Sequence, residues 1–441
     1  MNVNVLIRKY KTSLSIVWEN KILLYAVLIN LSYLFVSYIL FFTLLQTSTD
    51  FQIFYKSARV FLTQPANLYE KVNYIWDFRY LPLSTILFIP FSLLSFPLAY
   101  IMFNIVNFIL NLVISLMIYK IILFVKHKSH KDDEKRIYIY ISLFLMGVPH
   151  ILNYIYGQVN LYVTLFILIS LYLFLKNKSL KGQILPSFLL GVSILIKPTA
   201  LFLIPFLILL RIDFKQKKFN FEILKSFTRF GIALIPIFLN LIPLLMFPKM
   251  LSGFFQVNIA GAFTFSPNFS MSLTKNIMNF CYFFNIPFNQ LVLLLVIVGI
   301  IGGSGFIIYI FRNKNNNSLI FGFTLGILIM FLAYYDTWDH HLLNLIPLLI
   351  IIIFTLPRNS LITNNQIKPG LFFLNFFSLI FVGIWYLTYQ IFPYNFLAII
   401  AFFILFYGIL KYLLTFKYND DLVEEDQNKI QIIDEMRDNE G

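Results

Sequence analysis

Five carboxylates define the acid–base chemistry that this 441-residue chain could perform on the outer side of a membrane. The chain holds 20 Asp and Glu residues, and in the topology predicted below the others lie on the cytoplasmic side. The outer five are Asp50, Glu70, Asp77, Asp336 and Asp339. Asp50 follows the first apolar segment and is the leading candidate for a general base that takes a proton from a hydroxyl group. The alternative for Asp50 is a solvated helix-end residue or an N-cap.

An amphipathic helix is predicted directly after Asp50. Aromatic and small apolar residues recur at helical spacing from Phe51 to Phe61, while Lys56 and Arg59 fall on the other side. This pattern is typical of an interfacial helix that lies along a membrane surface. Such a helix would form one wall of a site, with Asp50 at its start.

Two basic residues could bind a phosphate group. Lys197 is the only ionisable residue in the apolar segment 183–210. Burying a lysine in a membrane costs about 2.5–3.5 kcal/mol, so such a residue normally faces water or an anion. Arg79 lies in the first outer loop and could hold a phosphate by two parallel hydrogen bonds. For both residues the alternative is a side chain that extends to the lipid headgroups.

Uncharged polar side chains complete the set of candidates. Gln158 and Asn160 follow a glycine between two apolar segments, and a turn alone does not require two carboxamides. His340 and His341 could contact a phosphate or a sugar hydroxyl. Adjacent residues on a helix point about 100° apart, so the two histidines are poorly placed to bind one metal ion, and we predict no metal site. The alternative for this segment is a solvated loop with an interfacial tryptophan at 338.

The composition identifies a helical membrane protein. Hydrophobic residues make up 59% of the chain, mean hydropathy is +0.80, and apolar runs near twenty residues recur from end to end. Backbone groups in lipid must be paired within the segment, which favours an all-α fold. The net charge of +14 reflects positive residues on the cytoplasmic side rather than nucleic-acid binding. The single cysteine, Cys281, excludes an internal disulfide.

The apolar runs predict about twelve transmembrane helices with both termini in the cytoplasm. The run 82–95 is too short to span and carries two prolines, so it is interpreted as an interfacial or re-entrant helix. This choice places the basic segments 126–136 and 211–229 inside, as the positive-inside rule requires. The predicted spans are 22–45, 98–125, 137–155, 158–175, 183–196, 198–210, 229–247, 291–311, 319–335, 342–356, 371–390 and 395–415.

The predicted domain organisation follows from these spans. A transmembrane domain covers 1–416, with outer loops at 46–97 and 248–290, and an acidic cytoplasmic tail covers 417–441. The segment 183–210 could instead be one kinked helix, which would invert everything after it. In the preferred topology every unusual polar cluster emerges on one outer face, as a single active site would require.

These landmarks together resemble glycosyltransferase family 87, whose members are membrane enzymes of the GT-C type. The resemblance rests on the order of several short motifs between about 45 and 345. They are Asp50 with Tyr55 and Ala58, Leu68-Tyr69, Tyr80-Leu-Pro82-Leu with Pro90, Asn107, Gly157-Gln158-Val159-Asn160, Leu195-Ile-Lys197-Pro198 with Gly191, and Trp338-Asp339-His340-His341. Where the family often has a glycine shortly before the Leu-Tyr pair, this chain has Gln64-Pro65-Ala66-Asn67.

The resemblance implies a hexosyltransferase that uses a polyprenyl-phosphate sugar, with mannose as the expected sugar and a lipid or glycan as the acceptor. It implies that Asp50 is the general base and that Lys197 and His340 or His341 hold the donor phosphate. Arg79, Tyr80, Gln158 and Asn160 complete the predicted substrate-binding set. The expected enzyme is inverting, uses no metal or cofactor, and acts at the non-cytoplasmic face of the plasma membrane.

Two other functions remain open from the sequence. A transporter or flippase for a lipid-linked sugar would also carry many spans and an intramembrane lysine. Such proteins usually show two related halves, and no repeat is visible in this chain. A scaffold without catalysis would require no site that joins Asp50 to Lys197.

Overall fold

A computed structural model describes the chain from Asn20 to Thr415 with short gaps. The described residues are 20–45, 49–126, 131–213, 218–260, 265, 267–312, 317–358, 360–388, 391 and 396–415. The predicted acidic tail 417–441 lies outside the described residues.

The first half of the described chain is helical. Short 3-10 and π turns connect the main elements. These are α2 (Lys21–Leu40), α3 (Asp50–Thr63), the 3-10 helix η4 (Pro82–Phe88), α4 (Ile89–Ser92), α5 (Phe96–Lys126), α6 (Lys131–Leu145), α7 (Pro149–Tyr156), α8 (Asn160–Lys176), α9 (Ile184–Ile196) and the 3-10 helix η6 (Pro198–Leu207).

A small antiparallel hairpin precedes the second half. Strands β1 (Leu210–Asp213) and β2 (Lys218–Phe221) pair with Leu210 opposite Phe221. The other described elements are helices, which agrees with the predicted all-α class. The remaining helices are α10 (Ile223–Phe238), α11 (Leu241–Met246), α12 (Pro248–Phe255), α13 (Leu273–Phe283), α14 (Gln290–Ile297), α15 (Gly303–Arg312), α16 (Ser318–Ala333), η10 (Asp339–His341), α17 (Leu342–Thr355), α18 (Lys368–Phe376), α19 (Ser378–Thr388) and α20 (Phe396–Thr415).

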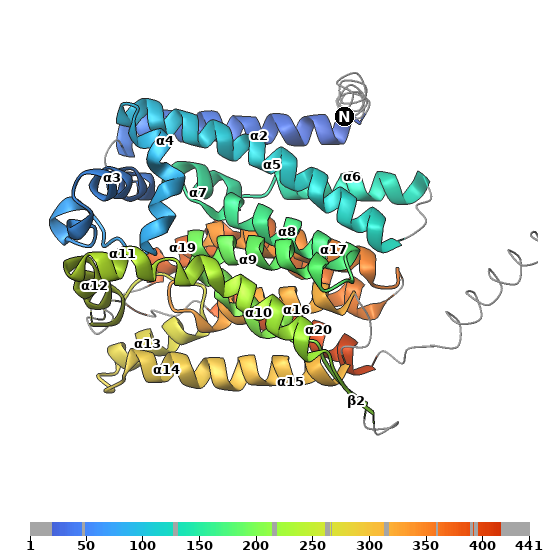
Figure 1. Cartoon of the computed structure of the whole chain (residues 1–441). Helices are drawn as coiled ribbons and strands as arrows, with labels where there is room; N and C mark the ends of the chain where they lie inside the picture. The colour runs from blue at the N-terminus through green and yellow to red at the C-terminus, as the bar shows by residue number, and fades with distance from the viewer. Residues whose placement is uncertain are drawn as a thin grey trace, which may run out of the picture.

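Helices α16 and α17 form the centre of the bundle. Every residue of α16 is buried, as are all residues of α17 except its last. Both sequences are apolar around the whole circumference, the composition of a helix enclosed by other helices. In Figure 1 they lie among α8, α9, α10 and α20, with α2 and α5 along one side and α14 and α15 along the other.

The long helices run side by side, so the bundle has two distinct ends (Figure 1). Helices α3, α11, α12 and α13 gather at one end, which we call the α3 end. The start of α2 and the β1–β2 hairpin lie at the other, which we call the hairpin end. This separation agrees with the predicted grouping of the outer loops on one face.

The apolar helices of the structure are those of a membrane protein, but they do not confirm the count of twelve spans. Within the described ranges, five helices are long and apolar enough to cross a membrane, and two bent helix pairs raise the number to as many as seven. Other apolar helices have 10–17 residues. At 1.5 Å per residue these are shorter than a hydrocarbon core of roughly 30 Å. Segment 82–95 folds as the short elements η4 and α4, as expected for a run too short to span.

Candidate functional site

Helix α3 places Asp50 at its first turn. Thr49 is the N-cap residue and makes no side-chain capping bond, so Asp50 itself is not the cap. Phe51, Phe54 and their apolar neighbours are buried on one face, and Arg59 is exposed, as the amphipathic pattern predicts. The burial of this face packs the helix against the bundle. The Asp50 carboxylate contacts Gln158, which follows α7.

The Gly157 turn brings Gln158 to Asp50. Gly157 has φ +62°, a left-handed conformation that favours glycine, and it ends α7. A Cβ atom at this position would lie 2.5 Å from the Cβ atom of Phe51, so only glycine lets α3 approach so closely. The Gln158 side chain donates a hydrogen bond from Nε2 to Oδ2 of Asp50. Two segments 108 residues apart therefore meet at the candidate base.

The same turn also contacts Lys197. Lys197 stands in extended conformation between α9 and η6, where Pro198 prevents the helix from continuing. The side chain is 6% exposed, and its Nζ donates a hydrogen bond to Oδ1 of Asn160 at 2.9 Å. The candidate base and the candidate phosphate-binding cation thus contact side chains two positions apart on one turn.

Burial and neighbouring charges set the acidity of Asp50. Burial raises the pKa of the Asp50 carboxyl above its usual range. The Gln158 hydrogen bond and the positive charge of Lys197 lower this pKa, and the negative charge of Asp336 raises it. Asp50, Lys197 and Asp336 therefore lie within electrostatic reach of one another.

The two histidines flank the turn from η10. The His341 Nδ1 atom accepts a hydrogen bond from the backbone N–H of Trp338 at 2.9 Å, and the His340 ring lies 6.2 Å from the ring of Tyr156. Burial lowers the pKa of both histidines, and the positive charge of Lys197 lowers it further. Both imidazoles are therefore neutral near pH 7, so they offer hydrogen bonds rather than charge.

Arg79 and Tyr80 line the side of the site nearest the first outer loop. Arg79 forms an ion pair with Asp336 at 3.8 Å, and Asp336 also accepts a hydrogen bond from the Trp338 indole at 2.8 Å. The ring of Tyr80 packs edge-on against Phe54 at 5.0 Å. Burial raises the pKa of Tyr80, and the charges of Asp50 and Asp336 raise it further, which places Tyr80 near both carboxylates.

The structure therefore brings together all of the predicted site residues. The sequence interpretation assigned no role to Asp336, although it counted this residue among the five outer carboxylates. It also did not identify Asn153, whose side chain contacts both Gln158 and Asn160. No local pattern singles out Asn153, which lies one turn before the glycine on a helix that also carries His150.

Several buried polar atoms at this site have no protein hydrogen-bond partner among the described residues. They are Oε1 of Gln158, both carboxylate oxygens of Asp339, Nδ1 of His340 and Nε2 of His341. Most buried polar groups in proteins are hydrogen-bonded, so a cluster of unpaired ones is typical of a site that binds a ligand or water. Within the described part of the chain, no three His, Cys, Asp or Glu side chains are arranged to hold a metal ion.

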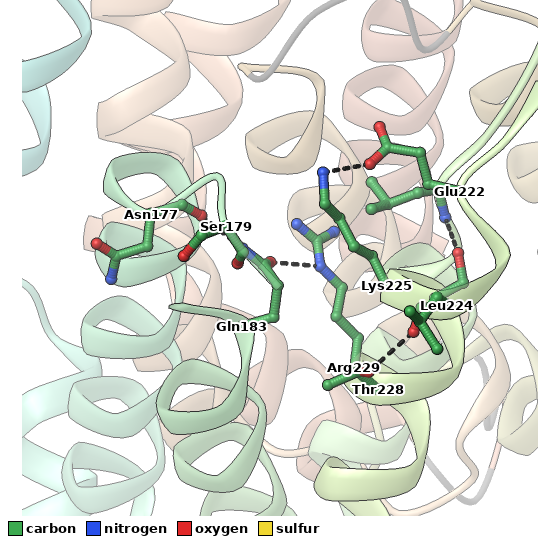
Figure 2. A network of polar contacts seen from close by, with 10 residues as sticks. Asn177, Ser179, Gln183, Glu222, Leu224, Lys225, Thr228 and Arg229 are labelled. Carbon is green, nitrogen blue, oxygen red and sulfur yellow. Dashed lines mark hydrogen bonds and ion pairs between the residues drawn. The ribbon is translucent and has the colours of Figure 1, made fainter. Parts of the chain in front are cut away.

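A second buried cluster lies at the hairpin end (Figure 2). The Arg229 Nε atom donates to Oε1 of Gln183 at 2.8 Å, and its guanidinium lies 4.6 Å from the ring centroid of Phe174. Lys225 and Glu222 form an ion pair beside it, drawn in Figure 2. This cluster joins α8, α9 and α10, where Gly191 allows close packing: a Cβ atom there would lie 2.3 Å from the Ala233 carbonyl oxygen.

Comparison with known proteins gives one match. The sequence model of glycosyltransferase family 87 matches residues 78–334, which is more than half of the chain. The matched range includes Gln158, Asn160 and Lys197 and leaves out Asp50 and the two histidines. No curated protein and no solved structure matches the chain.

Proposed function

The chain belongs to glycosyltransferase family 87, and we propose that it moves a hexose from a polyprenyl-phosphate donor to an acceptor hydroxyl. Mannose is the expected sugar, and the acceptor is a lipid or a glycan. The reaction takes place at the non-cytoplasmic face of the plasma membrane. Family membership favours this transfer over the alternative of a transporter or flippase.

The contact of Asp50 and Lys197 with one turn carries this proposal. Gln158 on the turn bonds to Asp50, and Asn160 bonds to Lys197. Transfer to a hydroxyl needs a base at the attacking oxygen and positive charge at the departing phosphate, and in an inverting reaction the two lie on opposite faces of the anomeric carbon. A rigid turn that contacts both groups fixes their separation.

In the proposed mechanism Asp50 acts as the general base. The acceptor hydroxyl oxygen attacks the anomeric carbon while the Asp50 carboxylate takes the hydroxyl proton. The bond between the anomeric carbon and the phosphate oxygen breaks, and polyprenyl phosphate leaves with the electron pair. Attack from the face opposite the phosphate inverts the anomeric centre. General base catalysis of this kind contributes about 10²–10⁴-fold to the rate.

Lys197 supplies charge to the departing phosphate in this mechanism. Its ammonium group is buried beside Asn160, where low polarity strengthens its attraction to an anion. His340 and His341, neutral near pH 7, would donate hydrogen bonds to phosphate or sugar oxygens. Arg79 is about half exposed and forms an ion pair with Asp336, so it is a weaker candidate for contact with the departing phosphate than the buried Lys197.

The test is an assay with purified protein in detergent and a panel of polyprenyl phosphates that carry mannose, glucose or galactose. The expected result is transfer from one lipid-phosphate sugar to an added lipid or glycan acceptor, with the new glycosidic bond of opposite anomeric configuration by NMR. Use of a nucleotide sugar instead, or retention of configuration, would contradict the proposal.

A further inference from the structure

We propose that Asn153 is a positioning residue that aims the Asn160 carboxamide oxygen at Lys197 and holds Gln158 in place for Asp50. This inference rests on the proposed function, in which Lys197 and Asp50 act on opposite faces of the anomeric carbon of the donor sugar. Asn153 lies in α7, one turn before Gly157, and its side chain is fully buried.

A chain of hydrogen bonds runs from Lys197 through Asn160 and Asn153 to Gln158, and its two end groups fix which atoms donate and which accept. At one end the Lys197 ammonium can only donate, so the oxygen of Asn160 must face it, as observed at 2.9 Å. The Asn160 Nδ2 atom then points away from Lys197 and donates to Oδ1 of Asn153 at 3.2 Å. The Asn153 Nδ2 atom faces the backbone oxygen of Gln158 at 3.4 Å, and that oxygen can only accept.

This direction matters because a carboxamide is not symmetric. If the Asn160 carboxamide rotated by 180°, its NH₂ group would face the ammonium of Lys197, and two donors would be opposed in a buried place. Asn153 prevents that rotation by offering an acceptor to the Asn160 NH₂ group.

Asn153 also fixes the part of the turn that serves Asp50. The Gln158 backbone N–H donates to the Asn153 carbonyl at 2.9 Å, so backbone and side chain of Asn153 both contact Gln158. From α5, Asn107 donates to the same Gln158 carbonyl at 3.4 Å, and Asn104 donates to the Tyr154 carbonyl at 3.0 Å. The turn is thereby held from the core of the bundle, and Asn153 connects the backbone of Gln158 to the side chain of Asn160.

A double-mutant cycle tests this role. Asn153→Leu keeps the approximate size and removes both side-chain hydrogen bonds. Asn160→Asp replaces the asymmetric carboxamide by a carboxylate with two equivalent oxygens, so that either orientation presents an acceptor to Lys197. We expect Asn153→Leu to lower kcat about tenfold or more in the natural background, and less than about threefold in the Asn160→Asp background. KM for the donor should change less than kcat.

The control is Gln183→Leu, which removes a buried carboxamide from the Arg229 cluster at the hairpin end. Its melting midpoint should fall, while transfer per folded molecule stays at the natural level. A loss of transfer in Gln183→Leu equal to that in Asn153→Leu would show a general effect of destabilisation and overturn the inference. If Asn153→Leu does not accumulate, Asn153→Ala takes its place in the cycle.

Melting midpoints of the four proteins separate this inference from the proposed function. Coupling between positions 153 and 160 in both kcat and melting midpoint supports the inference. If no lipid-phosphate sugar is used by the natural protein, the proposed function fails, and coupling in the melting midpoint alone still supports the orientation of Asn160 by Asn153. Equal effects of Asn153→Leu in both backgrounds, in every measurement, overturn it.

Discussion

Lys197 at the α3 end and Arg229 at the hairpin end form a natural pair for comparison. Both are buried, with 6% and 7% exposure, in a protein whose described helices are mostly apolar. Each donates one hydrogen bond to a carboxamide oxygen, at 2.9 Å to Asn160 and at 2.8 Å to Gln183. Burial of a cation beside an amide therefore does not by itself identify a functional residue.

The surroundings of the two cations differ. The guanidinium of Arg229 also stacks on the ring of Phe174, and in the described chain the buried polar atoms of Gln183 all have partners. Around Lys197, by contrast, Gln158, His340 and His341 each keep a buried polar atom that has no partner among the described residues. A satisfied cluster is typical of structural support, and an unsatisfied one is typical of a binding site. The comparison indicates that Arg229 joins helices, and it supports the proposal that Lys197 binds substrate.

The strongest test of this contrast is the variant Asp50→Asn. An amide of the same shape can still contact Gln158 but cannot take a proton, so transfer should fall by about 10²–10⁴-fold. The melting midpoint should stay the same or rise, because a buried carboxylate is replaced by a neutral group. Steady-state kinetics and thermal melting of the purified variant measure both effects. Full transfer activity in well-folded Asp50→Asn protein would refute the role of Asp50.

A second test removes each buried cation. Lys197→Met keeps the length of the side chain and removes its charge, and we expect kcat to fall by roughly 10²–10³-fold, the usual loss for one group that stabilises transition-state charge. Binding of polyprenyl phosphate, measured by competition with the donor, should weaken in parallel. Lys197→Arg should restore only part of the activity, because the larger guanidinium does not fit the Asn160 oxygen in the same way. Unchanged phosphate competition in Lys197→Met would contradict the assignment.

The matching change at the other end is Arg229→Met. This variant loses the hydrogen bond to Gln183 and the contact with Phe174, so we expect the protein to be less stable by about 1–3 kcal/mol. Transfer per folded molecule should remain within about twofold of the natural protein, since the cluster has no contact with the candidate site. Thermal melting and kinetics at a temperature well below the midpoint separate the two effects. A large fall in kcat would show that the two regions are coupled.

The sequence singled out residues that lie together in the fold, whereas it predicted the arrangement of the spans less well. Asp50, Lys197 and the Gly157 turn were recognisable because a charge or a glycine is unusual beside apolar runs. The start of an amphipathic helix after Asp50 followed from the spacing of its aromatic residues, and the structure has that helix at Asp50–Thr63.

Other features could not be derived from local patterns. The count of twelve spans rested on the apolar runs, and a helix enclosed by other helices, such as α16 or α17, is as apolar as one that faces lipid. The pairing of Arg79 with Asp336 joins two loops far apart in the chain, and no spacing predicts it. The contacts of Asn153 with Gln158 and Asn160 depend on the fold, which places its side chain between them.

The smallest expected effect is a shift in the pH dependence of transfer, which we expect for a change near Asp50 and not for a change in the Arg229 cluster. Asp50 must be deprotonated to act as a base, so transfer should fall as pH falls through its pKa. Burial raises that pKa above the usual value near 4, which places the acid limb of the profile at a higher pH than an exposed aspartate would give. The negative charge of Asp336 raises the pKa further, so Asp336→Asn should move the acid limb to lower pH.

Asp77→Asn removes a carboxylate from the same outer loop as Asp50 and should leave the limb in place, as should Arg229→Met. A limb that shifts to higher pH in Asp336→Asn, or that moves equally in Asp77→Asn, would mean that another group controls the profile.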